Sequence, residues 1–192
     1  MNSNNEIQKA NLLLAEHANL FSNYLGAFFK DDNNPTAVYY FDEYSKYART
    51  ELCYKAKTKL FSSLYSLKVR TIMKHVVMDE NWKGNVEFTG NLSVKGARIK
   101  VKGEKKETIR MLNKDEELMD GFVICNECTD LLPAEIIYKK ERKELEISIY
   151  PYAGAFICIK IPPVFYPLRM NKEEIYAICR LINVLYQKFS KS

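Results

Sequence analysis

Apolar residues recur at helical spacing at the start of the chain. Every seventh position from residue 7 is apolar over four repeats: Ile7, Leu14, Phe21 and Phe28. Residues seven apart lie on one face of a helix. Ser3 and Glu6 have the spacing of a capping box ahead of this face, so we expect a helix that begins there and ends within residues 30–35.

A second run of apolar positions follows at steps of three and four residues. Asn34 can cap a helix with Pro35 at its first position, where a missing N–H costs nothing. The apolar positions that follow include Phe41, Tyr44, Ala48, Leu52, Ala56, Leu60, Leu64 and Leu67. A helix over residues 35–75 would be about 60 Å long, so we expect it to project as part of a helical hairpin.

The apolar period changes to two from Val86 onward. Six segments have this alternation and are separated by short polar or turn-rich links: VEFTGNL, ARIKVKG, FVICN, AEIIYK, LEISIY and AFICIKI. Short links join antiparallel neighbours, because a parallel crossover needs about a dozen residues or more. The pattern therefore predicts an antiparallel sheet of about six strands in a meander.

The last segment has the pattern of a capped amphipathic helix. Asn171 and Glu174 form a capping box, and Met170 and Ile175 form a hydrophobic staple. We therefore predict an α+β fold in which this helix packs on the sheet. Residues 1–82 would be the helical hairpin, an arm or dimerisation element, and residues 83–192 the sheet and final helix, in one continuous domain.

Composition indicates a chain that folds nearly end to end. Hydrophobic residues make up 47% and charged residues 28% of the 192 residues, as in an average globular protein. The longest charge-free stretch, residues 147–159, is shorter than the roughly 20 residues that a membrane-spanning helix needs. The first residues have no basic residue followed by an apolar run, so we expect no secretory signal. Five cysteines fit reduced thiols, so we expect a cytoplasmic protein without membrane contact.

Cys125 and Cys128 have a C-x-x-C spacing that occurs in zinc and redox sites. A zinc site needs a second pair of ligands, and no second close pair of cysteines or histidines is present. A redox cysteine would sit at a helix N-terminus, where its pKa is lowered. We interpret both cysteines as packing residues, keep them as candidate metal ligands, and expect no cofactor.

Residues 95–110 form the most basic stretch, with seven Lys or Arg against two Glu. If residues 97–101 form a strand, its cations lie on the outer face and could contact phosphates. The candidate nucleic-acid-binding residues are Arg98, Lys100, Lys102, Lys105 and Lys106. No aromatic residue lies between Thr89 and Gly121 to stack on bases, so a solvated or edge-protecting face is the alternative that we favour.

The segment RTIMKH places Arg70 five residues before His75. It resembles the Arg-x4-His signature of the HEPN ribonucleases, which are all-helical domains in which this pair, duplicated across a dimer, acts on RNA. The resemblance implies Arg70 and His75 as catalytic candidates. A histidine at a helix end, stabilised by the helix dipole, is the alternative interpretation. Gly-rich phosphate loops and the nucleophile-elbow motif are absent, so an enzyme is unsupported.

Aromatic residues crowd the predicted second helix: Tyr39, Tyr40, Phe41, Tyr44 and Tyr47. Three consecutive rings cannot share one groove, so some should be covered by a partner. We therefore predict a non-enzymatic binding protein that forms a homodimer through its helices and binds a protein partner. A nucleic-acid-binding protein that uses the basic strand is the first alternative, and a ribonuclease is the second.

Overall fold

The computed structural model describes residues 3–31, 33, 35–41, 48–89, 96–101, 107–129 and 131–189, with backbone alone at residues 3 and 131–133. The helices of the described residues are α1 (Ser3–Leu25), α2 (Glu107–Asn113), α3 (Glu116–Thr129) and α4 (Lys172–Phe189), with a 3-10 turn at Lys140–Arg142. The strands are β1 (Phe28–Asp31), β2 (Val38–Phe41), β3 (Ala48–Thr58), β4 (Ser62–Met73), β5 (Trp82–Thr89), β6 (Gly96–Val101), β7 (Leu131–Lys139), β8 (Glu144–Pro151), β9 (Phe156–Lys160) and β10 (Pro163–Pro167).

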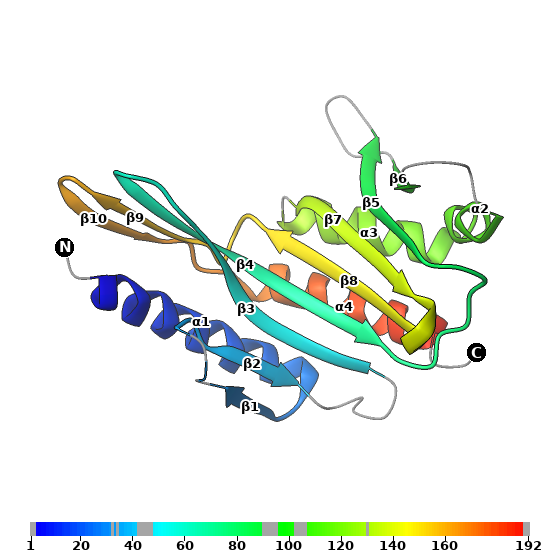
Figure 1. Ribbon diagram of the computed structural model, residues 1–192, viewed down its shortest axis with the longest axis horizontal. Coiled ribbons are helices and arrows are strands. Elements are labelled where there is room, and N and C mark those ends of the chain that lie inside the picture. Colours follow the sequence, from blue (N-terminus) through cyan, green and yellow to red (C-terminus); the bar gives the residue numbers. More distant parts are fainter. Residues whose placement is uncertain are drawn as a thin grey trace.

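All ten described strands belong to one antiparallel sheet, in the order β1-β2-β3-β4-β8-β7-β5-β6. The long strand β4 has two successive partners along the same edge. Its second half pairs with β8, in the register Val69↔Ile149, and its first half pairs with β9, in the register Ser62↔Ile159. The hairpin of β9 and β10 therefore lies beside the hairpin of β3 and β4 (Figure 1).

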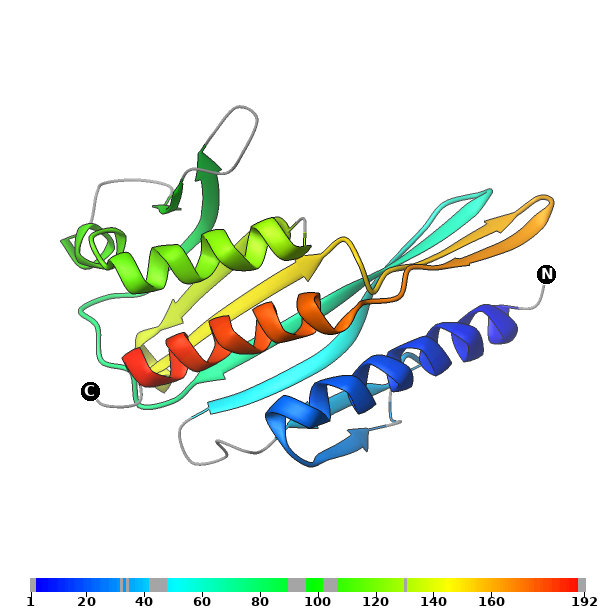
Figure 2. The same ribbon diagram turned by 180° about the vertical axis from the view of Figure 1, so that it is seen from behind.

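The helices α1, α3 and α4 cover one face of the sheet, and no described helix covers the other (Figures 1 and 2). The core lies between the helices and the sheet. The helix residues in it include Leu14, Phe21, Phe122, Ile178 and Ile182, and the strand residues include Leu52, Leu67, Val86, Ile136 and Ile147. Antiparallel sheets commonly bury one face and expose the other. The exposed side is called the open face below.

The two long helices from opposite ends of the chain meet at a buried histidine. His17 on α1 is 1% exposed, and its Nε2 accepts a hydrogen bond from the backbone N–H of Met170 at 3.3 Å. Burial lowers the pKa of His17 to about 4, against a smaller opposing effect of Glu16, so the imidazole is neutral at pH 7. His17 is therefore part of the packing between α1 and the start of α4.

The predicted α+β class is confirmed, and so is the final helix. The Asn171 N–H donates to Glu174 Oε2 at 2.6 Å, and the Glu174 N–H donates to Asn171 Oδ1 at 2.9 Å, which completes the capping box. The apolar stripe of α4 faces the core, with Ile175 and Ile178 fully buried. The first helix also begins at Ser3, but it ends at Leu25, before Gly26 with its positive φ of 72°.

The predicted helix over residues 35–75, and with it the helical hairpin, is wrong. The described residues of this segment form β2, β3 and β4. Burial alternates along β4, where Leu67, Val69, Thr71 and Met73 face the helices. Leucines four apart fit a helix, but Leu60 and Leu64 are exposed at the end of the hairpin and do not belong to the buried face.

The predicted six-stranded meander also has too few strands, because the sheet of the described residues has ten. Five of the six predicted segments overlap strands β5 to β9, but FVICN lies within helix α3. In this short apolar run, Phe122 and Cys125 are buried on the face of α3 that packs against α4 and the sheet, whereas Val123 and Ile124 are half-buried. A run of this length fits a buried helix turn as well as a strand, so alternation alone could not separate them.

Candidate functional site

The catalytic pair suggested by the HEPN resemblance does not lie on a helix. Arg70 is on strand β4, and His75 is an exposed residue with a φ of 64° in the connection after that strand. The Arg70 guanidinium donates to Glu51 Oε2 at 3.0 Å and to Glu146 Oε2 at 2.7 Å. These contacts hold the guanidinium between the carboxylates of β3 and β8. In the structure Arg70 therefore compensates two buried negative charges on the open face.

Arg70 is the centre of a row of charges across β3, β4 and β8. Glu51 and Glu146 are 5% and 8% exposed, and each has a second cation, Arg49 at 2.7 Å and Lys139 at 3.3 Å respectively. Burial acts to raise the pKa of Glu146, but the Arg70 and Lys139 contacts outweigh it, so the pKa lies below its ordinary value. The hydrogen bond to Glu146 raises the pKa of Arg70. The row therefore places at least three cations, Arg49, Arg70 and Lys139, beside two carboxylates.

The described residues of the predicted nucleic-acid site are paired with a carboxylate. Arg98 and Lys100 lie on β6 and contact Glu87 of β5 at 3.1 Å and 3.0 Å. The hydrogen bonds from Lys100 and Arg98 lower the pKa of Glu87, which stays ionised between them. Lys102, Lys105 and Lys106 lie outside the described residues.

The cysteine pair does not form a metal centre with other described residues. Cys125 is buried and Cys128 is exposed on α3, and burial raises the pKa of Cys125 to about 12. Within the part of the chain that the structure describes, no group of three or more His, Cys, Asp or Glu is placed to hold a metal ion. The Thr129 hydroxyl donates to the Cys125 carbonyl at 2.6 Å, as expected within a helix turn.

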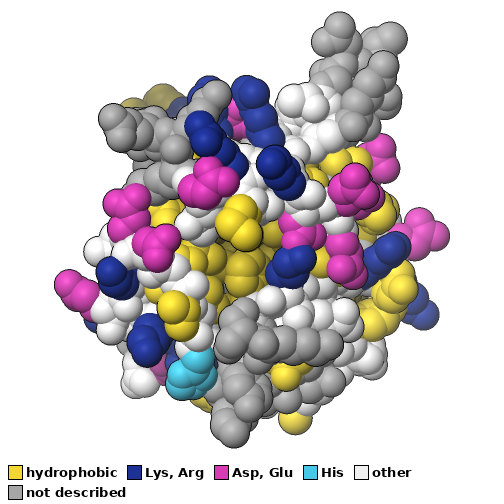
Figure 3. Space-filling model, turned by 90° about the vertical axis from the view of Figure 1, so that its right-hand side faces the viewer, with side chains coloured by type: hydrophobic (Ala, Val, Ile, Leu, Met, Phe, Trp, Pro, Cys, Tyr) yellow, Lys and Arg dark blue, Asp and Glu magenta, His cyan; other side chains and the backbone are white. Residues whose placement is uncertain are grey.

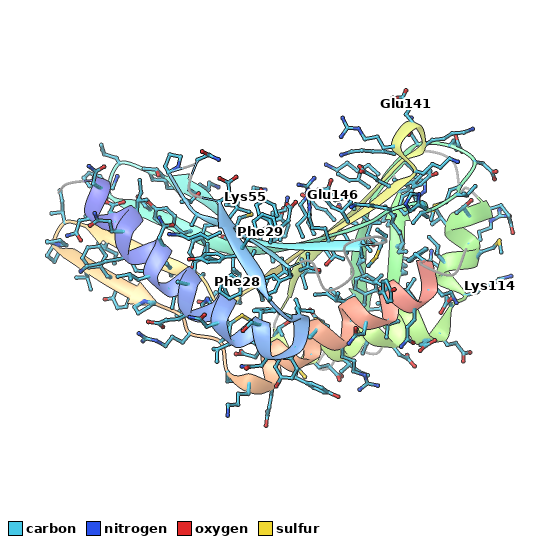
Figure 4. The ribbon with its side chains drawn as sticks, turned by 90° about the horizontal axis from the view of Figure 1, so that it is seen from below. Phe28, Phe29, Lys55, Lys114, Glu141 and Glu146 are labelled. Atoms are coloured by element: carbon cyan, nitrogen blue, oxygen red, sulfur yellow. The ribbon has the colours of Figure 1, made fainter. Side chains whose placement is uncertain are left out.

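The aromatic residues of the predicted interface are divided between the core and the open face. Tyr39 and Phe41 are 4% and 2% exposed and pack against Phe28. Tyr40 alternates with them and stacks on Phe29 at 4.8 Å between ring centroids. Figure 4 shows Phe28 directed toward the helices and Phe29 directed away from them. Tyr44 and Tyr47 lie outside the described residues.

The most unusual surface is the end of the molecule formed by two adjacent hairpins. We define the β-arm as residues 54–66 of β3 and β4 and residues 156–167 of β9 and β10 (Figure 1). Its basic residues are Lys55, Lys57, Lys59 and Lys160, and it has no Asp or Glu. The opposite end of the molecule has cations and carboxylates side by side (Figure 3). No carboxylate within the β-arm itself therefore balances its four lysines.

The two faces of the β-arm differ in chemistry. One face packs under α1, where Tyr65 donates to Glu6 at 3.5 Å and the Lys9 ammonium lies 3.8 Å from the centre of the Phe165 ring. The other face belongs to the open face of the sheet, where Figure 4 shows Lys55 and Glu146 on the side away from the helices. A cross-strand row on that face combines a cation with apolar groups: Lys57, Leu64, Ile157 and Tyr166.

Both turns of the β-arm expose apolar side chains. Leu60 is 80%, Phe61 59% and Ile161 71% exposed. The sequence signal for this site is that each turn has a lysine followed directly by apolar residues, KLF at 59–61 and KIPP at 160–163. Hairpin turns are usually polar or glycine-rich. The sequence interpretation missed this signal because it assigned the first turn to a helix.

The model of the family described as "Protein of unknown function (DUF3156)" matches the chain over residues 21–189. The chain belongs to this family. The DUF3156 match includes the whole of the β-arm, the open face of the sheet and helix α4. No curated protein and no solved structure matches the chain.

Proposed function

We propose that this protein is a non-enzymatic binding protein and that the β-arm is the element that binds its partner. The observation that carries the proposal is the joint exposure of apolar side chains and unbalanced lysines on the β-arm. Three turn residues, Leu60, Phe61 and Ile161, are each more than half exposed, next to Lys59 and Lys160. Exposed apolar groups grouped beside polar ones are typical of interaction sites.

The charge of the β-arm indicates the chemistry of the partner. Four lysines without a carboxylate produce a positive potential at that end of the molecule. Three other cations of the open face are paired: Arg70 with Glu51 and Glu146, and Arg98 and Lys100 with Glu87. The partner should therefore have an anionic surface, and it should contact the β-arm more than the basic strand β6.

A second candidate function, self-association, is favoured by the edge strand β1. Among the described strands β1 has one neighbour, β2, so its outer edge can pair with another strand. Phe29 on β1 is 50% exposed and stacks on Tyr40. Two copies could pair their β1 strands about a twofold axis and bury both rings, which would give the homodimer that the aromatic residues suggested.

The proposed binding function can be tested with a polyanion column. The protein is run isocratically on immobilised heparin at several salt concentrations, beside Lys55→Gln/Lys57→Gln/Lys59→Gln. The slope of log affinity against log salt should decrease by about 2 to 3 in this triple variant, because each phosphate-like contact contributes about 0.9.

A triple variant at other exposed lysines, Lys83→Gln/Lys114→Gln/Lys140→Gln, is the matched control. It changes the net charge by the same amount, and its slope of log affinity against log salt should stay close to that of the wild type. Equal slopes for the two triple variants would contradict the assignment of the β-arm as the binding element, because net charge alone would then explain retention.

A further inference from the structure

The ends of the two hairpins form one continuous tip. The backbone N–H of Lys160 donates to the Phe61 carbonyl at 2.9 Å, and its ammonium donates to the Lys59 carbonyl at 3.3 Å. Ser62 pairs with Ile159 just behind these bonds. Both ribbon views show the two turns side by side, away from the body of the sheet (Figures 1 and 2). The exposed side chains of Leu60, Phe61 and Ile161 therefore belong to one surface.

The tip has two layers of different chemistry. The outer layer is apolar and consists of the turn residues, with Pro162 and Pro163 also exposed. The layer behind it consists of lysines at the ends of the strands, Lys59 and Lys160, followed by Lys57 and Lys55 along β3. A phospholipid bilayer with anionic headgroups has the complementary order, with charge outside and hydrocarbon inside.

We propose that the tip of the β-arm docks on an anionic phospholipid bilayer, with Leu60, Phe61 and Ile161 inserted among the headgroups and the lysines against the lipid phosphates. This inference rests on the proposed binding function of the β-arm and names its partner. It concerns attachment to the surface only. None of the described helices is long and apolar enough to cross a bilayer.

The size and composition of the tip favour a bilayer over other anionic partners. A stable protein interface buries about 800 Å² on each side, from about 20 residues or more, and two adjoining turns are smaller than that. A nucleic acid would use the lysines, but its phosphates offer nothing to cover the aliphatic side chains of Leu60 and Ile161. Insertion into a bilayer uses the apolar side chains and the lysines together.

Sedimentation with vesicles tests the inference. Wild-type protein is mixed at low salt with vesicles of phosphatidylcholine alone and with vesicles that contain phosphatidylserine. Binding is expected to the second kind only. Each lysine near an anionic surface raises the affinity for the membrane about fivefold. The affinity of Lys55→Gln/Lys57→Gln/Lys59→Gln for these vesicles should therefore be lower by on the order of a hundredfold. The affinity of Leu60→Ser/Phe61→Ser/Ile161→Ser for these vesicles should be lower by at least about tenfold, because the variant lacks the apolar side chains that leave water on insertion.

The matched control is Leu12→Ser/Val77→Ser/Met111→Ser, which removes three other apolar side chains that are at least 66% exposed. It should bind like the wild type. A direct readout is Phe61→Trp, whose added fluorescence should shift to shorter wavelength on anionic vesicles, whereas the native Trp82 is 5% exposed and stays in the core. No shift, or equal losses in the two serine variants, would overturn insertion of the tip.

The heparin and vesicle experiments separate the two proposals. If the protein does not bind anionic vesicles but its heparin retention depends on the lysines of the β-arm, the bilayer assignment is wrong and the binding function of the β-arm stands. If neither measurement depends on these lysines, both proposals are wrong. If the wild type binds nucleic acid at low salt but no vesicle, the lysines serve a different polyanion, which also overturns the bilayer assignment.

Discussion

Arg70 is the central charged residue of the open face. It contacts two carboxylates that are nearly excluded from water, Glu51 and Glu146, while 28% of its own side chain remains exposed. Removal of one partner of a fully buried ion pair costs about 3 to 5 kcal/mol, because the remaining charge has lost its compensation. The cost here should be smaller, since Arg49 and Lys139 remain beside the carboxylates and water reaches Arg70.

Arg70→Met should therefore lower the free energy of unfolding at pH 7 by about 2 kcal/mol, measured by urea denaturation. Because the pKa of Glu146 is lower in the folded state than in the unfolded state, its contribution is present above about pH 4.3 and is lost as the pH falls through the folded-state value. The difference between wild type and Arg70→Met should accordingly narrow in acid. Arg142→Met, on the exposed 3-10 turn, is the control and should change stability little. An equal difference at pH 7 and pH 3 would contradict this account.

The residue scale also shows what local sequence could predict. The capping box at Asn171 was predicted correctly because its hydrogen bonds join residues three apart. The partners of Arg70 lie 19 and 76 residues away in the chain. A single sequence contains no signal that pairs residues at such distances, so Arg70 could be interpreted only through a short motif and its neighbour His75.

At the scale of elements, β5 and β6 approach each other unusually closely at one glycine. A Cβ built on Gly84 would lie 2.7 Å from the carbonyl oxygen of Lys100. Gly84→Ala should therefore separate the two strands and destabilise the protein by about 1 to 3 kcal/mol. Hydrogen exchange should show the loss of protection concentrated in β6. In the control, Gly96→Ala, the nearest atom to the new Cβ is the Thr89 side-chain oxygen at 3.2 Å, which can move. Equal losses from the two substitutions would show that close approach is not the cause.

The elements that sequence misassigned share a physical reason. In residues 48–73 the leucines occur at steps compatible with a helix, while Lys55, Lys57 and Lys59 alternate as in a strand. Which period applies depends on whether partner strands are present, and two of the three partners of β4 come from distant residues, 145–149 and 156–159. The β-arm could not be predicted for the same reason, because its two hairpins are about 100 residues apart in the chain and meet only in the folded structure.

At the scale of the whole molecule, the edge strand β1 leads to a prediction about assembly. If β1 strands of two copies pair, sedimentation should detect a dimer at high micromolar concentration, and Phe29→Lys should weaken it by placing a charge on the shared edge. Tyr152→Lys changes another aromatic residue, which is 60% exposed and lies outside β1, and should leave the dimer intact. A wild-type protein that stays monomeric at high micromolar concentration would exclude this assembly.

The position of α4 in the chain has a consequence for synthesis. This helix follows all ten described strands, yet its residues Ile175, Ile178 and Ile182 fill the centre of the apolar layer. While a ribosome extends the chain from its amino end, the part of the inner face of the sheet that α4 covers stays exposed until this helix has left the exit tunnel. A nascent chain stalled before residue 172 therefore exposes a broad apolar surface to chaperones and to other copies until α4 is made and packs on the sheet.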